Sequence, residues 1–223
     1  MFKTEEVDWK PAYRIVPTRF PSVYLFDRVA SQEDFDLLNQ LEAMTNTRLR
    51  DEIGELALVP KEQRLFGPGS GPIMAAFTHL NPAGSRFSDG SYGVFYAARE
   101  REAAIAETRY HSTRFMQATG EKAMYLQMRL YQVRVKGEVV DLHAYCKKHP
   151  DILAPESYAA AQVAGKKVRA SNANGLIYPS VRFPGGSCVA AFKTGILKNC
   201  RHASYLEYHW DGKQINYITE QIS

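Results

Sequence analysis

The sequence predicts an α+β fold with strands in the centre and at the end of the chain and a few helices between them. Residues 99–116 are rich in Ala, Glu and Arg at helical spacing, whereas residues 124–135 alternate between polar and apolar as a half-buried strand does. The chain has 223 residues, 45% hydrophobic and 23% charged, with no internal repeat. This length and composition suffice to bury a core, so we expect one domain over residues 1–223.

The first elements are predicted from their boundaries. A short apolar stretch at residues 12–16 lies between Pro11 and Pro17 and indicates a first strand. A helix is expected over residues 31–43, where Ser31 can cap the first turn and leucines recur near helical spacing.

Residues 44–72 are polar and end in the Gly- and Pro-rich stretch 66–72. Gly and Pro there predict a loop without regular structure. Its three glycines could cradle a phosphate, but the strand, helix and Lys of a nucleotide loop are missing, and a surface turn is the plainer alternative. We treat residues 31–72 as a helical and loop elaboration of the domain.

The segment that follows carries the main candidate residues. A turn at Asp89-Gly90 leads into a strand at residues 93–97, and the helix over residues 99–116 comes directly after it. Within that helix Glu107 shares a face with Ala103 and Ala104, because residues three and four apart are neighbours. A carboxylate on a small-residue face points toward a packed or ligand-lined space.

The rest of the chain predicts mostly strands. A strand at residues 124–135 and another at 138–142 are expected on either side of a turn at Gly137, followed by a helix over residues 154–164 and a loop at residues 171–175. Further β patterns occur at residues 176–182, 188–192, 204–210 and 215–218.

Composition excludes several classes of protein. No segment reaches membrane-spanning length and the acidic N-terminus is unlike a secretory signal, so we expect a cytoplasmic protein. Cys146, Cys188 and Cys200 lack metal-ligand spacing, which indicates reduced thiols. The net charge of +4 lies mostly in the second half of the chain, but no basic run is dense enough to predict nucleic-acid binding.

Residues 84–108 resemble the RES family, named for an Arg, a Glu and a Ser. The matching residues are Arg86, Glu107 and Ser180, with Tyr96 as the central Tyr and Arg14 as an early Arg. The resemblance extends over roughly residues 13–192. It is more specific than a short motif because Arg86, Tyr96 and Glu107 keep both their identities and their intervals.

The resemblance implies an ADP-ribosyltransferase-like mixed β core with flanking helices. It also implies a toxin of a type II toxin–antitoxin system, neutralised by a helix-turn-helix antitoxin of the Xre type. Members of the family degrade NAD+ by hydrolysis, by phosphorolysis as an NAD+ phosphorylase does, or by transfer of ADP-ribose to a protein. NAD+ would then be a consumed substrate, and no cofactor is expected. Whether water, phosphate or a protein accepts the ADP-ribose stays open, as does a homodimer within the complex.

The chemistry of three residues fits this role. Breaking the nicotinamide–ribose bond creates an oxocarbenium-like ribose, and the carboxylate of Glu107 can stabilise it, an effect of about 3–4 kcal/mol in comparable deletions. Arg86 offers a planar fork of donors to the pyrophosphate, and Arg14 could hold its other side or the nicotinamide ribose. The non-functional alternatives are that Glu107 is an ordinary surface residue and that Arg86 and Arg14 form surface ion pairs.

Two further residues complete the predicted site. Tyr96 could stack on nicotinamide, although a Tyr in a strand is more often part of the core, and Ser180 could position Glu107 or the nicotinamide ribose. His111, one turn after Glu107, is left outside the core site because a lone His on a helix is more often structural.

Two rival functions stay open. One is a non-catalytic nucleotide-sensing or antitoxin-docking module, and the other is a nucleic-acid-binding domain that uses the basic second half of the chain. The His and Cys residues show no metal-ligand cluster, and no glycine-rich dinucleotide turn follows the first strand, so neither a metal enzyme nor a Rossmann dehydrogenase is predicted.

Overall fold

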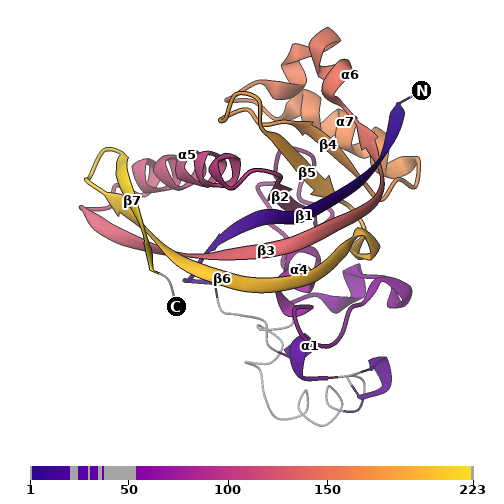
Figure 1. Ribbon diagram of the computed structural model, residues 1–223. Coiled ribbons are helices and arrows are strands. Elements are labelled where there is room, and N and C mark those ends of the chain that lie inside the picture. Colours follow the sequence, from indigo (N-terminus) through magenta and orange to yellow (C-terminus); the bar gives the residue numbers. More distant parts are fainter. Residues whose placement is uncertain (1, 21–24, 30, 35–36, 38–53, 222–223) are drawn as a thin grey trace.

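The computed structural model describes residues 2–20, 25–29, 31–34, 37 and 54–221 (Figure 1). Its centre is a seven-stranded mixed sheet with the strand order β1-β2-β5-β4-β3-β6-β7. The strands are β1 (Lys3–Pro17), β2 (Phe95–Ala98), β3 (Met124–Asp141), β4 (Gly175–Pro179), β5 (Ser187–Ala191), β6 (Leu197–Trp210) and β7 (Ile215–Gln221). Within the described residues the α-helices are α1 (Leu25–Arg28), α4 (Gly71–Thr78), α5 (Arg101–Thr119), α6 (His143–Lys148) and α7 (Ala159–Ala170). Short 3₁₀ turns are η1 (Leu56–Leu58), η2 (Lys61–Gln63), η3 (Pro150–Leu153) and η4 (Thr194–Ile196). The predicted α+β class is confirmed.

The sheet closes on itself at one end. β1 pairs with β2 on one side and, over nearly its whole length, with β3 on the other. Strands β1, β2, β5, β4 and β3 therefore form a barrel-like ring, and β6 and β7 extend from β3 as an antiparallel pair. β1, β3 and β6 run beside one another as three long curved strands (Figure 1).

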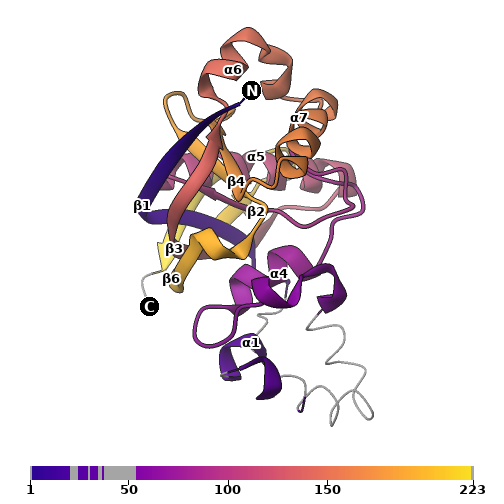
Figure 2. The ribbon, with the colours of Figure 1, turned by 90° about the vertical axis from the view of Figure 1, so that its right-hand side faces the viewer.

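Two hydrophobic clusters lie on opposite faces of these strands, since successive side chains of a strand alternate. The α4-side cluster contains Phe95 and Ala97 of β2 together with residues of α1 and α4, and the α5-side cluster contains Ala98 together with residues of α5, α6 and α7. In Figures 1 and 2, α5, α6 and α7 lie on one side of the sheet and α1 and α4 on the other. This division decides which side chains can share a site.

The first strand is longer than predicted because Pro11 does not end it. The β1–β3 register shifts between Trp9 and Ala12, so Pro11 lies in an irregularity of the ladder. Proline lacks an N–H and is tolerated within a strand at such a bulge.

The predicted turn at Gly137 is wrong, and β3 runs through it as one strand. Gly137 pairs with Val7 of β1 and has a φ of 145°. A Cβ atom at this position would lie 2.7 Å from the side chain of Ile196. Gly137 is therefore a site of close packing within a strand and not a hairpin turn.

The prediction that residues 66–72 exclude regular structure is wrong at their end. Gly71 and Pro72 begin helix α4, where proline suits the first turn because its missing N–H has no helical partner there. Gly69 has a φ of 83°, and a Cβ atom on it would lie 2.1 Å from the carbonyl oxygen of Cys200. Close packing on β6 thus accounts for this glycine without a phosphate.

Ser31 caps the start of a helix as predicted. Its Oγ accepts a hydrogen bond of 3.1 Å from the main-chain N–H of Asp34. Most of the helix predicted over residues 31–43 lies outside the described residues.

The helix predicted over residues 154–164 begins later, at Ala159. Residues 154–158 form no regular structure, and the carbonyl groups of Ala154 and Pro155 accept hydrogen bonds from arginine side chains.

The other predicted strands, the helix at 99–116 and the loop at 171–175 are present with shifted ends. The three cysteines are free thiols, as expected. Among the described helices, none is both long and apolar enough to cross a membrane.

Candidate active site

Glu107 lies on helix α5 on the face that packs toward the sheet. Ala103 and Ala104, one turn earlier, are buried in the α5-side cluster and bring the helix close to the strands. Their small side chains leave the half-buried Glu107 facing the end of β4. The position that helical periodicity predicted for this carboxylate is therefore the observed one.

One carboxylate oxygen of Glu107 is held by three donors from consecutive residues. Glu107 Oε1 accepts hydrogen bonds from Ser180 Oγ at 2.7 Å, from the Val181 N–H at 2.9 Å and from the Arg182 N–H at 3.2 Å. Within the described residues, no hydrogen bond reaches Oε2. The carboxylate is thus fixed in orientation and keeps one oxygen for another partner.

Ser180 organises the turn that binds Glu107. Besides donating to Glu107, its Oγ accepts hydrogen bonds from the N–H groups of Arg182 at 3.3 Å and Phe183 at 3.1 Å. A hydroxyl that accepts from the two following main-chain groups shapes a tight turn. Ser180 therefore positions Glu107, one of the two roles predicted for it.

Arg86 is buried on the same side of the sheet, with 7% of its surface exposed. Its Nη1 donates to the carbonyl oxygens of Ile152 at 3.2 Å and Ala154 at 3.1 Å, and its guanidinium lies 4.7 Å from the ring centre of Tyr158. Its Nη2 is buried and has no hydrogen-bond partner among the residues that the structure describes. A buried cationic donor without an acceptor is costly, and a bound anion would satisfy it.

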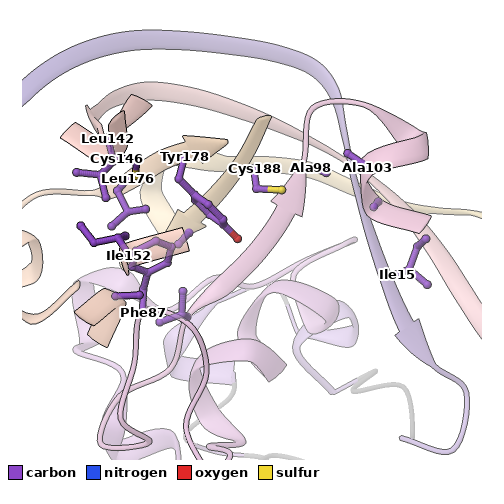
Figure 3. Packing of buried hydrophobic residues seen from close by; sticks show 14 of the residues in the cluster. Ile15, Phe87, Ala98, Ala103, Leu142, Cys146, Ile152, Leu176, Tyr178 and Cys188 are labelled. Atoms are coloured by element: carbon purple, nitrogen blue, oxygen red, sulfur yellow. The ribbon is translucent and has the colours of Figure 1, made fainter. Parts of the chain in front are cut away.

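The turn that carries Arg86 is anchored in the core. Phe87 is fully buried and its ring packs edge-on against Tyr178, with 4.8 Å between the ring centres. Figure 3 shows Phe87, Tyr178 and Ile152 close together in the α5-side cluster. The backbone next to Arg86 is therefore held rigidly.

The Tyr96 hydroxyl bonds the residues on both sides of Arg86. It accepts a hydrogen bond of 2.9 Å from the Phe87 N–H and shares one of 2.8 Å with Ser85 Oγ. Burial raises the pKa of Tyr96 to about 12, so the hydroxyl stays protonated. In this structure Tyr96 positions Arg86. Its stacking on nicotinamide stays a prediction.

Arg14 lies away from these residues. Its guanidinium lies 4.5 Å from the ring centre of Phe95, which belongs to the α4-side cluster, and Nη1 donates to the main-chain oxygen of Tyr96 at 3.0 Å. The Tyr96 side chain packs against the opposite cluster. The structure thus brings Arg86, Tyr96, Glu107 and Ser180 together and places Arg14 across the strand from them.

Helix α5 and the residue after Val181 supply groups that the sequence analysis did not single out. Arg182 lies with its guanidinium 3.2 Å from the ring centre of Tyr110, and its Nη2 donates to the Pro155 oxygen at 2.7 Å. Arg114 forms an ion pair of 2.8 Å with Glu156. Tyr110 and Arg114 follow Glu107 by three and seven residues, so helical spacing could have found them.

His111 is close enough to the cluster to respond to its charges. Removal of its ring from water lowers the pKa of His111 below its ordinary value. Glu107 acts against this shift, whereas Arg86, Arg182 and Arg114 reinforce it. His111 therefore lies within electrostatic reach of both predicted catalytic side chains, and it is a neutral imidazole near pH 7.

Residues 152–158 cover this cluster, and we call them the strap. Its carbonyl groups accept hydrogen bonds from Arg86 and Arg182, and the Tyr110 hydroxyl donates to Pro155 at 3.3 Å and to Glu156. Two pockets lie elsewhere and are lined by neither Glu107 nor Arg86; the lining of the larger, of about 500 Å³, includes Tyr131 and Cys200 of the α4-side cluster. The fixed carboxylate of Glu107 and the buried guanidinium of Arg86 under the strap are a stronger indication of an active site than the volume of the other pocket.

Comparison with known proteins identifies the family. The family model described as RES domain matches residues 61–211. Uncharacterized protein y4oC of Sinorhizobium fredii is 30% identical over 210 residues, which cover 92% of this chain and 85% of that protein. The crystal structure of the M. tuberculosis MbcT-MbcA toxin-antitoxin complex contains a chain with 13% identity and a TM-score of 0.49, covering 89% of this chain and 86% of that one. At this sequence identity and TM-score, the similarity supports no conclusion about the function of this chain. The match to the RES domain over most of the sequence confirms the predicted resemblance, and the chain belongs to the RES-domain family.

Proposed function

We propose that this RES-domain chain is a toxin of a type II toxin–antitoxin system that cleaves the nicotinamide–ribose bond of NAD+. One observation carries the proposal: a carboxylate with one fixed and one unbonded oxygen lies in the same electrostatic surroundings as a buried arginine with an unpaired donor. Glu107 and Arg86 both act on His111 and on Tyr158. Such a pair suits a ligand that carries phosphate at one point and develops positive charge at another.

Glu107 would act on the ribose. As the bond to nicotinamide breaks, positive charge grows on the sugar ring, and Oε2 can accept a hydrogen bond from a ribose hydroxyl while the carboxylate stabilises that charge. The three donors to Oε1 preorganise the group, so little reorganisation accompanies the reaction.

Arg86 would bind the pyrophosphate through Nη2. A guanidinium is suited to phosphate because its N–H groups form a planar fork. Arg182 carries a second guanidinium against the strap, and its Nε is likewise buried without a hydrogen-bond partner in the described part of the chain. Two arginines with unpaired nitrogens match the charge of a dinucleotide better than one does.

The strap would have to move for NAD+ to enter. Its bonds to Arg86, Arg182 and Tyr110 use groups that the proposal assigns to the ligand or to its surroundings. Closure of the strap over the bound dinucleotide would then exclude bulk water and favour transfer of the ADP-ribose to an acceptor held in the site.

The test is incubation of the purified chain with NAD+, with nicotinamide release followed over time. Mass spectrometry with and without inorganic phosphate separates the acceptors, because ADP-ribose and its 1″-phosphate differ in mass. ADP-ribose on a protein would appear as an adduct on that protein. Unchanged NAD+ under all these conditions would instead favour a nucleotide-sensing or antitoxin-docking module.

The proposed partner is a small helix-turn-helix antitoxin of the Xre type, on the basis of the family resemblance. Expression of the chain alone should deplete NAD+ and arrest growth, and co-expression of the neighbouring gene product should relieve both. An arrested culture with a normal NAD+ level would exclude NAD+ loss as the cause of the arrest.

A further inference from the structure

A second group of reactive side chains lies outside the Glu107 cluster. Asp141 ends β3, His143 begins α6, and Ser187 begins β5. His143 Nδ1 lies 2.7 Å from Asp141 Oδ1, and His143 Nε2 lies 3.0 Å from Ser187 Oγ. A serine, an imidazole and a carboxylate are thus linked in one chain of hydrogen bonds.

The direction of these hydrogen bonds follows from the groups themselves. Burial alone would raise the pKa of Asp141, but hydrogen bonds from the His143 main chain and ring lower it below its usual value. Asp141 is therefore an ionised carboxylate, which only accepts hydrogen bonds, so His143 Nδ1 must be the donor. In the neutral imidazole Nε2 is then an acceptor, and the Ser187 hydroxyl must donate to it.

Exposure decreases from the imidazole to the carboxylate, as catalysis requires. The side chain of His143 is 35% exposed and that of Asp141 is 11% exposed. Ser187 is half-buried at the end of its strand. A reagent can therefore approach the serine and the imidazole, while the carboxylate stays shielded.

Arg99 adds a cation beside the serine. Its main-chain N–H donates to the Ser187 oxygen at 2.8 Å, one step beyond the β2–β5 register in which Ala98 pairs with Cys188. Side chains directly opposite in such a pair share a face, about 5 Å apart at Cβ. The Arg99 side chain is 62% exposed, and the Ser187 N–H is occupied by Glu100. Arg99 Nε also lies 4.0 Å from Glu100 Oε1, so a cation and a carboxylate together flank the serine and their charges offset one another.

We propose that Ser187, His143 and Asp141 form a second catalytic site, a serine nucleophile that accepts the acyl group of small esters. Ser187 Oγ forms a bond to the acyl carbon while its proton passes to His143 Nε2. The ester C–O bond breaks, and the alcohol leaves with that proton. Water then attacks the acyl-serine by the same route, which releases the carboxylic acid and restores the serine. Within the described residues these three side chains form no hydrogen bond to Glu107, so this proposal stands independently of NAD+ cleavage.

The test uses the full chain and a fluorophosphonate probe. Ser187 Oγ attacks phosphorus, the P–F bond breaks and fluoride leaves, so the intact mass should rise by one adduct that peptide mapping places on Ser187. Ser187→Ala should abolish the adduct. Ser171 lies in the loop after α7, and its hydroxyl donates to the main-chain oxygen of Val168. The control variant Ser171→Ala should be labelled by the probe as the wild type is.

Two variants separate catalysis from structure. His143→Gln and Asp141→Asn should slow labelling by about a hundredfold or more, the usual contribution of a general base and its orienting group. Circular dichroism must show both variants folded. If Ser187→Ala does not fold, the Ser187→Cys variant replaces it. Iodoacetamide should alkylate this variant faster when His143 is present than when His143 is also changed to Gln. Absence of an adduct, an adduct on another residue, or equal rates in folded His143→Gln would overturn the proposal.

Discussion

Arg86 and Arg14 are alike in nearly every local respect and differ in what surrounds them. Each guanidinium lies over an aromatic ring, at 4.7 Å for Arg86 and 4.5 Å for Arg14, and each has a buried nitrogen with no hydrogen-bond partner among the described residues. Arg86, however, shares its side of the sheet with Glu107, whereas Arg14 faces the α4-side cluster. Burial of an arginine is therefore a weak sign of function, and a nearby fixed carboxylate is the stronger one.

The largest effect is expected from Glu107→Gln, which tests the carboxylate side of this comparison. Gln keeps the size and an acceptor but loses the charge, so kcat for NAD+ should fall by roughly a hundredfold or more. KM should change little if Glu107 acts mainly in the transition state. Steady-state nicotinamide release measures both, after thermal melts show the variant folded. Wild-type turnover in folded Glu107→Gln would remove the central step of the mechanism.

Arg86→Met and Arg14→Met form a matched pair that tests the two arginines directly. Loss of a charged hydrogen bond to phosphate costs about 1.5–3 kcal/mol, so Arg86→Met should raise KM for NAD+ by about tenfold to a hundredfold. Arg14→Met should leave kcat and KM within about twofold, because Arg14 lies across the strand from the cluster. Equal losses in the two variants would contradict the division proposed here.

Tyr96→Phe tests whether Arg86 depends on the hydroxyl that bonds its neighbours. The change leaves the Phe87 N–H without its partner, a cost of about 1–3 kcal/mol, so Tm should fall by about 2–12 °C. KM should rise about fivefold as Arg86 loses its fixed position. A drop in Tm without any change in KM would limit Tyr96 to a structural role.

The smallest effect is expected from Glu156→Gln, which weakens the bond between the strap and Arg114. Exposed ion pairs contribute about 0.2–1 kcal/mol, so kcat/KM should rise by about two- to threefold if strap opening limits access. Asp8→Asn, which breaks an exposed pair with Arg134 between β1 and β3, is the matched control and should not change turnover. A decrease in kcat/KM for Glu156→Gln would mean that the strap assists binding instead of restricting it.

The sequence predicted the parts of the site that depend on short intervals. Helical periodicity predicted that Glu107 lies on the sheet-facing side of α5. The residue intervals that match the RES family predicted Arg86 and Tyr96 as its partners. It could not place Arg14, because the side of a strand depends on register, and the register of β1 shifts at Pro11. The strap was also missed, since Ala-rich residues favour a helix unless side chains elsewhere in the chain bind their carbonyl groups.

The closure of β1 against β3 has a consequence for synthesis of the protein. β1 is made first, but its main partner β3 extends to Asp141, and the donors that hold Glu107 come only from residues 180–182. At ribosomal rates of about 5–20 residues per second, roughly 6–25 s separate the first strand from its partner. A nascent chain therefore has neither a closed sheet nor a fixed Glu107 until most of it has left the ribosome, so the proposed NAD+ cleavage would begin only when synthesis is nearly complete.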